Sequence, residues 1–297
     1  MARIEFGGQA AIVTGAGSGI GRATALLLAA RGARVLVNDA GAGRAESVVR
    51  EIESASGQAV ADLTPVGTHA AARAIAAAAM NAFGRIDILV NNAGIARPGQ
   101  FGAIGDDDLD RVMAVNLTGP FALMRAVWPA MCAQRHGRIV NISSSAAFGS
   151  GISGPYAVSK AGLIGLTKDA GIAGRALGIL VNAVMPQAYT PLLDNHPDLA
   201  FRDWMRGRFP PESVAAVIAF LASRAMRDSA EIYAAGGGRA ARIAFVQGAG
   251  HYDPDLTVDT VGEHFAAIQY LSDGKPVITQ SDHEAIQDTV FPGRPGA

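Results

Sequence analysis

The chain has 297 residues, of which 49% are hydrophobic and 17% are charged, and it contains 36 glycines. This balance suits buried strands and tight turns, and it excludes a disordered chain. The formal net charge is -1 and no lysine- or arginine-rich run occurs, which argues against a nucleic-acid partner and favours a small-molecule substrate.

The single cysteine, Cys132, cannot form an intrachain disulfide, which fits a reducing cytoplasm. The first six residues lack a secretory apolar core, and the alanine-rich stretch 70–79 is too short to span a bilayer. We therefore expect a soluble cytoplasmic protein that has no membrane partner.

Short runs rich in valine and isoleucine alternate with longer helix-like stretches. The expected strands are 10–14, 34–38, 86–90, 138–142, 180–184 and 242–246. The expected helices are 19–31, 43–56, 70–83, 107–134, 155–177 and 211–223. The alternation implies right-handed crossovers and strands buried on both faces. The sequence thus predicts an α/β fold with a single Rossmann-type, doubly wound parallel sheet and helices on both faces.

The last part of the chain differs from the rest. Residues 250–297 contain several acidic residues, prolines and glycines, with one convincing helix at 261–271. We expect one domain over 1–245, and an extension over 246–297 that is either packed on the core or partly ordered.

A glycine-rich turn follows the first expected strand and opens into a helix. Glycines let the backbone approach a pyrophosphate closely, and a helix N-terminus directs N–H groups at it. Strand, glycine loop and helix occur here in the required order, which favours a phosphate-binding turn over an ordinary one. The residues expected to hold the phosphates are Gly15, Gly17, Ser18, Gly19, Ile20 and Gly21.

Asp39 follows the next strand, 18 residues beyond Gly21. A carboxylate at this position can accept hydrogen bonds from the adenosine ribose hydroxyls and would repel a 2'-phosphate. The next residue is Ala40, which offers no cation for a phosphate. NAD is therefore the expected cofactor and NADP the less favoured one, although Arg22 and Arg44 keep that option open.

Polar segments lie where the third and fourth strands of the sheet should end. Ligands of doubly wound sheets bind at this carboxyl edge. Either segment alone could be loop capping, but the glycine loop is at the same edge, and we expect contacts with the adenine and the ribose. The residues concerned are Asp62 and Leu63, then Asn92, Ala93 and Gly94 after Asn91.

Tyr156 and Lys160 are four residues apart, and if Pro155 starts a helix they share one face about 6 Å apart along its axis. A free tyrosine, with a pKa of about 10, is a poor base at neutral pH. A neighbouring ammonium can stabilise its phenolate, while a serine hydroxyl polarises the substrate oxygen. The pair is therefore the expected proton acceptor for an alcohol that loses hydride to the cofactor.

These motifs together resemble the short-chain dehydrogenase/reductase superfamily over roughly residues 5–240. The matching residues are Thr14, Gly15, Gly19, Gly21, Asn91-Asn92-Ala93-Gly94, Asn116, Tyr156 and Lys160. The resemblance implies that Asn116 holds a water that links Lys160 to solvent. It also implies a homodimer or homotetramer, because family members usually pair through the helices expected at 107–134 and 155–177.

Two short segments suggest a closer relationship. Val37-Asn38-Asp39 and residues 236–242 resemble the (3R)-hydroxyacyl-CoA dehydrogenase part of multifunctional enzyme type 2. That enzyme group is also known for 17β-hydroxysteroid oxidation. Both segments lie away from the substrate, so they indicate subfamily more than substrate.

The sequence departs from the family at two places. Ser143 has the usual spacing of 13 residues to Tyr156, whereas counting forward from Asn116 places the catalytic serine at Ser144. We prefer Ser144 because a strand end fixes a side chain firmly, and Ser143 stays the alternative.

The second departure follows the expected strand 180–184. Pro186 precedes Gln187 where the family has glycine, so either Gln187 adopts an unusual backbone conformation or the loop takes a different course. Pro186, Tyr189 and Thr190 are the expected contacts with the nicotinamide. The segment 192–210 is rich in apolar residues and could form a lid over an apolar substrate or pack as an ordinary helix.

The sequence thus predicts an NAD-dependent oxidoreductase that interconverts a secondary alcohol and a ketone, with a 3-hydroxyacyl-CoA or a hydroxysteroid as the leading substrate. The alternatives are a carbonyl reductase of another small substrate and a catalytically silent dinucleotide-binding regulator. The regulator predicts loss of Tyr156, Lys160 or Asn116, and all three are present. The six histidines show no ligand spacing, so no metal is expected.

Overall fold

The computed structural model describes residues 3–194 and 198–290, with side chains to residue 286. The chain divides into two compact units, residues 1–242 and residues 243–297, and each is described by itself. None of the helices in the described part of the chain is long and apolar enough to cross a membrane.

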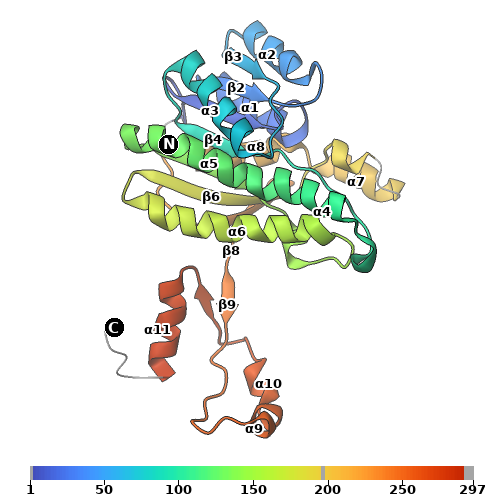
Figure 1. Cartoon of the computed structure of the whole chain (residues 1–297), viewed down its shortest axis with the longest axis vertical. Coiled ribbons are helices and arrows are strands. Elements are labelled where there is room, and N and C mark those ends of the chain that lie inside the picture. Colours follow the sequence, from blue (N-terminus) through green and yellow to red (C-terminus); the bar gives the residue numbers. More distant parts are fainter. Residues whose placement is uncertain (1–2, 195–197, 291–297) are drawn as a thin grey trace. The chain divides into compact units, whose positions relative to one another are not determined.

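The first unit is built on an eight-stranded sheet in the order β3-β2-β1-β4-β5-β6-β7-β8 (Figure 1). Its strands are β1 (Ala10–Thr14), β2 (Arg34–Asn38), β3 (Gln58–Asp62), β4 (Ile88–Asn91), β5 (Gly137–Ile142), β6 (Ile179–Pro186), β7 (Ile232–Gly236) and β8 (Arg239–Ile243). The pairs from β3 through to β7 are parallel. The strand order reverses between β1 and β4, and at such a point the crossovers diverge and leave a crevice at the carboxyl edge.

Helices cover both faces of this sheet. They are α1 (Gly19–Ala30), α2 (Arg44–Ser54), α3 (His69–Phe83), α4 (Asp106–Met113), α5 (Gly119–Gln134), α6 (Gly154–Arg175), α7 (Leu199–Arg208) and α8 (Pro211–Leu221). Val13 packs in the core cluster that includes residues of α1, α2 and α8, whereas Ile12 packs in the cluster that includes residues of α3 and α5. Successive residues of β1 therefore serve two cores, which confirms the doubly wound α/β fold.

The structure corrects two of the expected elements and adds a strand that the sequence analysis did not expect. The strand expected at 242–246 does not exist as one element, because β8 ends at Ile243 and β9 (Phe245–Gln247) pairs in a separate sheet. The last parallel strand is β7, which leads into β8 through Gly237 and Gly238, both at positive φ as two-residue hairpin turns require. The helix expected at 107–134 is interrupted by a π-helical turn at Ala114–Thr118.

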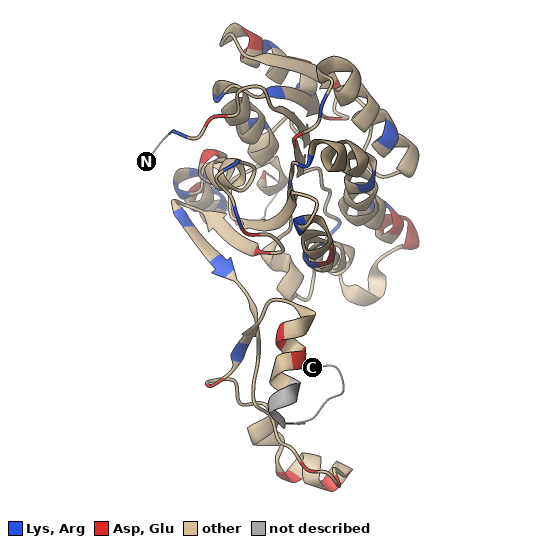
Figure 2. Ribbon diagram, turned by 90° about the vertical axis from the view of Figure 1, so that its left-hand side faces the viewer, with Lys and Arg blue, Asp and Glu red and all other residues tan. Residues whose placement is uncertain are grey.

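The part of the second unit that the structure describes, residues 243–290, contains a two-stranded sheet and three helices. Strand β9 pairs antiparallel with β10 (Lys275–Val277). The helices are α9 (Val258–Glu263), α10 (Phe265–Ile268) and α11 (Gln280–Val290). The helix expected at 261–271 therefore begins earlier and breaks at His264, which has φ -104° and ψ 11°. Acidic side chains outnumber basic ones along this unit, whereas both signs are interspersed along the first (Figure 2).

Candidate active site

The glycine loop joins β1 to α1 at the carboxyl edge of the sheet. A Cβ atom on Gly21 would lie 2.3 Å from the carbonyl oxygen of Gly15, so the loop can close only with glycine there. Ser18 makes no side-chain cap to α1, and the first N–H groups of the helix are therefore available to an anion. The side chain of Ile20 is buried in the core, so only its backbone can face a ligand.

Asn92 holds the loop from the neighbouring strand. Its Nδ2 donates to the carbonyl oxygens of Thr14 and Gly15 at 2.9 and 3.0 Å. Thr14 Oγ1 in turn accepts from the backbone N–H groups of Asn92 and Ala93 at 3.1 and 3.0 Å. The side chain of Asn92, expected at the cofactor, thus binds the glycine loop. The backbone of Ala93 lies beside Gly15 of that loop, and Gly94 follows it.

Asp39 lies against the glycine loop, as its position after β2 predicts. Its Oδ2 accepts from the N–H of Gly17 at 3.0 Å, and its Oδ1 accepts from the N–H of Gly41 at 2.8 Å. A Cβ on Gly17 would lie 2.7 Å from Oδ2, so glycine is needed for this approach. The carboxylate is therefore fixed where the adenosine ribose of a dinucleotide bound at the loop would lie.

Asp62 ends β3 and is fixed by the buried Asn38 of β2. Asn38 Nδ2 donates to Asp62 Oδ1 at 2.7 Å, and the N–H of Thr64 donates to the same oxygen at 3.0 Å. The next side chain, Leu63, is 50% exposed and offers an apolar surface beside the carboxylate. A fixed carboxylate beside an apolar side chain suits the amino group and the ring of an adenine.

Tyr156 and Lys160 lie on one face of α6, with the Lys160 Nζ 5.5 Å from the centre of the tyrosine ring. Lys160 is 3% exposed, its Nζ donates to the carbonyl oxygen of Ile142 at 2.6 Å, and burial lowers its pKa to about 8. Burial raises the pKa of Tyr156 above its usual value, and this outweighs the opposing effect of a hydrogen bond with Ser144. The structure therefore does not show the expected lowering of the Tyr156 pKa by Lys160.

The two candidate serines face different ways. Ser144 hydrogen-bonds the side chain of Tyr156, and its Oγ accepts from the N–H of Ala146 at 3.1 Å. Ser143 is 1% exposed, and its Oγ donates to the backbone carbonyl of Lys160 at 2.7 Å. The geometry therefore favours Ser144 beside the reacting group and gives Ser143 a role in fixing α6 to β5.

Asn116 lies within the π-helical turn between α4 and α5 and is completely buried. Its Oδ1 accepts from the N–H of Ile95, and its Nδ2 donates to the Ile95 carbonyl, both at 2.9 Å. The Nδ2 also donates to Ser159 Oγ at 3.2 Å. Both Nδ2 donors of Asn116 are thus engaged, whereas Oδ1 keeps one acceptor site, so a water linked to Lys160 has this oxygen or a backbone group of the turn as its partner. π-turns interrupt the regular helical hydrogen bonds and make such groups accessible.

The loop after β6 takes a different course from the one expected of the family. Gln187 extends the strand by donating its N–H to the carbonyl of Ala235 at 2.8 Å, and its φ is not positive. Gln187 therefore does not take over the conformation of a glycine. Thr190 does approach the cofactor loop, since a Cβ on Gly19 would lie 3.1 Å from its Cγ2.

Tyr189, expected at the nicotinamide, has its hydroxyl hydrogen-bonded towards α7. Its hydroxyl donates to Asp194 Oδ1 and accepts from Arg206 Nη2, both at 2.6 Å. Thr190 therefore lies beside the glycine loop, and Pro186 ends β6. The Tyr189 side chain is bonded to the segment 192–210 that could form a lid.

The sequence reasoning missed two polar residues that support the site. Ser159 accepts from Asn116 and donates to the carbonyl of Tyr156 at 2.8 Å, so it joins the catalytic helix to the π-turn. Asn141 in β5 accepts from Asn91 Nδ2 at 2.8 Å. A polar residue at a position that the strand or helix pattern buries was the available signal for both.

Residues 9–195 match the model of the short chain dehydrogenase family, and the chain belongs to that family. Its members are oxidoreductases that bind a nicotinamide dinucleotide and act on small molecules, so this class of activity and cofactor applies to the chain. The expectation of an enzyme of this family is therefore confirmed.

Individual relatives share most of the chain. A short-chain type dehydrogenase/reductase of Mycobacterium tuberculosis, Rv0148, is 36% identical over 275 residues, which cover 89% of this chain and 95% of the relative. The (2S)-[(R)-hydroxy(phenyl)methyl]succinyl-CoA dehydrogenase subunit BbsD of Thauera aromatica is 37% identical over 221 residues, covering 72% of this chain and 89% of that subunit.

A solved structure extends the similarity to nearly the whole chain. Full-length peroxisomal multifunctional enzyme type 2 from Drosophila melanogaster has a TM-score of 0.80 and 30% identity, over 97% of this chain. The match covers 50% of that larger protein, so the chain spans about half its length. The predicted closeness to multifunctional enzyme type 2 is thus confirmed for that half.

Proposed function

We propose that this enzyme oxidises a secondary alcohol to a ketone with NAD. The observation that carries the proposal is that Ser144, just after β5, hydrogen-bonds Tyr156 of α6, whose ring centre lies 5.5 Å from the Lys160 Nζ. A regulator that only bound the dinucleotide would have no need for a lysine ammonium buried at this place, because burying a charge is costly.

The reaction removes two hydrogens from the alcohol, the C–H hydrogen as a hydride and the O–H hydrogen as a proton. When held at the glycine loop, NAD would supply the acceptor for the hydride and positive charge that favours ionisation of Tyr156. The hydroxyl proton passes to the Tyr156 oxygen, while Ser144 hydrogen-bonds the substrate oxygen and the ketone forms. Lys160 stabilises the Tyr156 phenolate electrostatically and passes the proton from the tyrosine towards the Asn116 turn.

The residues around the glycine loop fit NAD better than NADP. The Asp39 carboxylate faces the loop and would repel a 2'-phosphate. Arg22 is paired with Glu51 and is therefore not free to bind a phosphate. Arg44 packs its stem against Gly17 and Gly41, with the carboxylate of Asp39 beside it.

The substrate is proposed to be apolar near the reacting carbon. Three loops leave the carboxyl edge after β4, β5 and β6, and each carries exposed large apolar side chains. These are Phe101, Phe148, Ile152, Leu192, Leu199 and Trp204. The acyl-CoA named for the Thauera relative combines an apolar group with a benzylic hydroxyl, which supports a 3-hydroxyacyl-CoA over a hydroxysteroid.

A homo-oligomer is proposed through α5 and α6. Their outer faces carry Phe121, Val158 and Ile172 at 46, 54 and 51% exposure. Exposed apolar side chains on two adjacent helices are typical of a surface that a second copy covers. Sedimentation velocity of the wild type and of a Phe121→Asp variant tests this. The variant is expected to sediment as a monomer, and an unchanged sedimentation coefficient would contradict this interface.

The function is tested by following NADH formation with a panel of 3-hydroxyacyl-CoA thioesters, hydroxysteroids and aryl alcohols. Turnover is expected with the thioesters, and a much lower kcat/KM with NADP than with NAD. Turnover with the steroids alone would identify a hydroxysteroid, rather than an acyl-CoA, as the substrate class. An absence of turnover with every compound, despite NAD binding, would contradict the enzymatic role of the site.

A further inference from the structure

Three arginines lie at the amino edge of the sheet, where its parallel strands begin, opposite the edge that carries the reacting residues. Arg138 is the second residue of β5. Arg224 and Arg227 lie on the loop 222–231 between α8 and β7. Because β5, β6 and β7 are parallel, the start of β5 and the loop before β7 are at the same edge.

The guanidinium of Arg138 is largely buried but keeps unused donors. The residue is 7% exposed, and its Nε donates to the carbonyl of Ser223 at 3.2 Å. Its Nη1 donates to the carbonyls of Gly137 and Gly178 at 2.8 and 3.2 Å. These bonds use three of the five N–H groups of an arginine. Among the residues that the structure describes, the two N–H groups of Nη2 have no partner, so they are available to a ligand.

Hydrogen bonds place a second guanidinium beside the first. Arg138 binds the carbonyl of Ser223, and Arg227 Nη1 donates to the next carbonyl, that of Arg224. The two guanidinium groups therefore contact consecutive carbonyls of one turn. Burial lowers the pKa of Arg138 to about 10, and the charges of Arg227 and Arg224 lower it further in the same direction. Burial, Arg138 and Arg224 also lower the pKa of the neighbouring His136 to about 4, so these charges act on one place.

No carboxylate neutralises this cluster. Within residues 3–194 and 198–290, none of the three arginines forms an ion pair. Asp87, which faces His136, is paired with Arg85 at 2.6 Å. Asp228 follows the cluster in the chain, and its charge acts on Tyr233 of β7. Like charges that meet without a carboxylate repel each other, and a bound anion would remove this cost.

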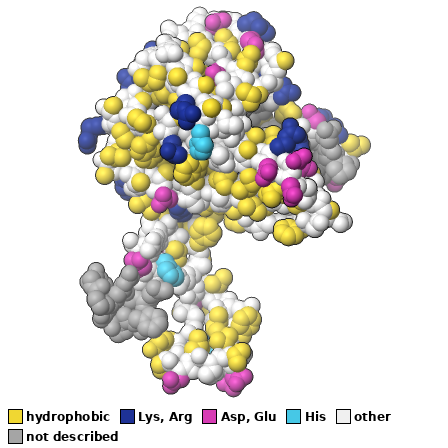
Figure 3. All heavy atoms as spheres, viewed as in Figure 1, with side chains coloured by type: hydrophobic (Ala, Val, Ile, Leu, Met, Phe, Trp, Pro, Cys, Tyr) yellow, Lys and Arg dark blue, Asp and Glu magenta, His cyan; other side chains and the backbone are white. Residues whose placement is uncertain are grey.

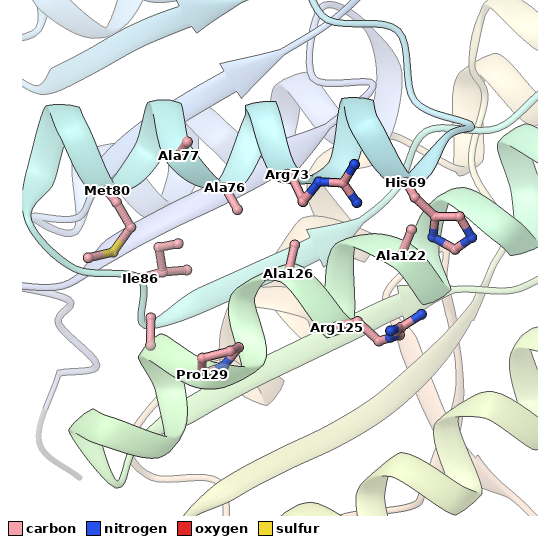
Figure 4. A pocket seen from close by; sticks show the side chains of 11 residues that line it. His69, Arg73, Ala76, Ala77, Met80, Ile86, Ala122, Arg125, Ala126 and Pro129 are labelled. Carbon is pink, nitrogen blue, oxygen red and sulfur yellow. The ribbon is translucent and has the colours of Figure 1, made fainter.

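The groove between α3 and α5 differs from this cluster. It has a volume of about 500 Å³, and alanine side chains of both helices lie along it (Figure 4). Apolar side chains lie beside basic ones on the same face of the molecule (Figure 3), as they do at interfaces between chains. Arg125 and Pro129 line the groove and follow Phe121 at intervals of four residues. The α5 side of the groove thus belongs to the face proposed for a second copy of the chain.

We propose that Arg138, Arg224 and Arg227 bind a phosphate group at the amino edge of the sheet. Arg138 donates from Nη2 to one phosphate oxygen, and the two arginines of the loop bind the others. A phosphate monoester carries a charge of about -1.5 to -2 at pH 7 and three acceptor oxygens, which suits three cations better than a carboxylate does. The ligand is therefore inorganic phosphate or the phosphate monoester of a small molecule. The site is separate from the cofactor and the reacting group, so it does not rest on the proposed function.

The proposal is tested by calorimetric titration of the full chain with inorganic phosphate at constant ionic strength. NAD is kept saturating, so that phosphate does not enter the glycine loop. One phosphate is expected to bind per chain, and the double variant Arg224→Gln/Arg227→Gln should bind it roughly 10- to 100-fold more weakly, because it loses two charge-assisted contacts. The matched control Arg50→Gln/Arg111→Gln removes two exposed arginines elsewhere and should change the affinity by about 2-fold or less.

Arg138→Lys separates the charge of this residue from its hydrogen bonds. Lysine keeps the positive charge but lacks the planar Nη2 donors, so phosphate should bind roughly 10-fold more weakly. Urea unfolding is measured beside it, because the variant also loses bonds to three carbonyls. The double variant changes only exposed side chains, so it keeps the test if Arg138→Lys does not fold. Its kcat should equal that of the wild type, because Arg224 and Arg227 lie at the edge opposite Tyr156.

Two further ligands identify the chemistry. Acetate, which carries a single charge, should bind at least about 10-fold more weakly than phosphate. Glycerol 3-phosphate that binds more tightly than inorganic phosphate would identify an organic monoester as the ligand, and the reverse order would identify free phosphate.

Four results would overturn the proposal. The first is an absence of saturable phosphate binding by the wild type. The second is binding that the double variant leaves unchanged. The third is an equal loss of affinity in the Arg50→Gln/Arg111→Gln control, which would show that phosphate responds only to overall charge. The fourth is acetate binding as tight as that of phosphate.

Discussion

Replacing each of the two adjacent serines by alanine separates their roles. Ser144 Oγ accepts from the N–H of Ala146, which leaves its own proton for the Tyr156 or substrate oxygen. Ser143 Oγ donates to the carbonyl of Lys160 from a buried position, so its proton is committed to the backbone. The two substitutions remove the same atom at neighbouring positions and should act on different properties.

The magnitudes follow from these contacts. Loss of one hydrogen bond to the developing negative charge costs about 100- to 1,000-fold in kcat, or about 3 to 4 kcal/mol. Ser144→Ala should show this loss with little change in stability. Ser143→Ala should keep kcat within about 3-fold and lower the free energy of unfolding by about 1–3 kcal/mol, because a buried carbonyl loses a donor.

Two assays on the same preparations measure both effects. Initial rates of NADH formation give kcat, and urea unfolding followed by circular dichroism gives the free energy of unfolding. NAD affinity, measured by calorimetry, shows whether the cofactor site is intact. If Ser143→Ala loses activity 100-fold while Ser144→Ala keeps it, the assignment of the serines is wrong.

Three further predictions concern the cofactor, the core and the pH dependence. Asp39→Ser should lower the ratio of kcat/KM for NAD to that for NADP by roughly 10- to 100-fold, and an unchanged ratio would contradict the role of this carboxylate. Asp87 is fully buried, pairs with Arg85 and accepts from the N–H of Ala10, so Asp87→Ala should cost about 2–4 kcal/mol in urea unfolding, against about 0–1 for the exposed Asp203→Ala. Burial lowers the pKa of His136 from 6.5 to about 4, so the unfolded chain binds more protons between these values and stability should fall as the pH drops from 6.5 to 4. His136→Gln should flatten that slope, and an equal slope in both proteins would refute the cause.

The sequence predicted the central strands and the glycine loop because their residues are governed by local chemistry. β1, β2 and β5 are almost wholly buried and read as continuous apolar runs. β3 lies at the sheet edge and mixes exposed and half-buried residues, so it shows no such run. β7 contains Ala234, Ala235 and Gly236, which favour no element clearly, and its place was assigned instead to residues 242–246.

The parts of the site that the sequence did not predict depend on contacts between distant segments. The choice between Ser143 and Ser144 stayed open because it depends on where α6 lies against β5. The family resemblance of the loop predicts Tyr189 at the nicotinamide, and it did not predict that Asp194 and Arg206 hold its hydroxyl. No pattern within residues 186–190 could show that interaction.

The central claim is that Tyr156 takes the proton of the alcohol. The most direct measurement is a single turnover of Tyr156→Phe with NAD and the best thioester substrate, beside Tyr270→Phe, which removes an exposed hydroxyl of the second unit. Tyr156→Phe should react about 100- to 10,000-fold more slowly than the wild type while it binds NAD with unchanged affinity, and Tyr270→Phe should react at the wild-type rate. A wild-type rate in Tyr156→Phe would contradict the account.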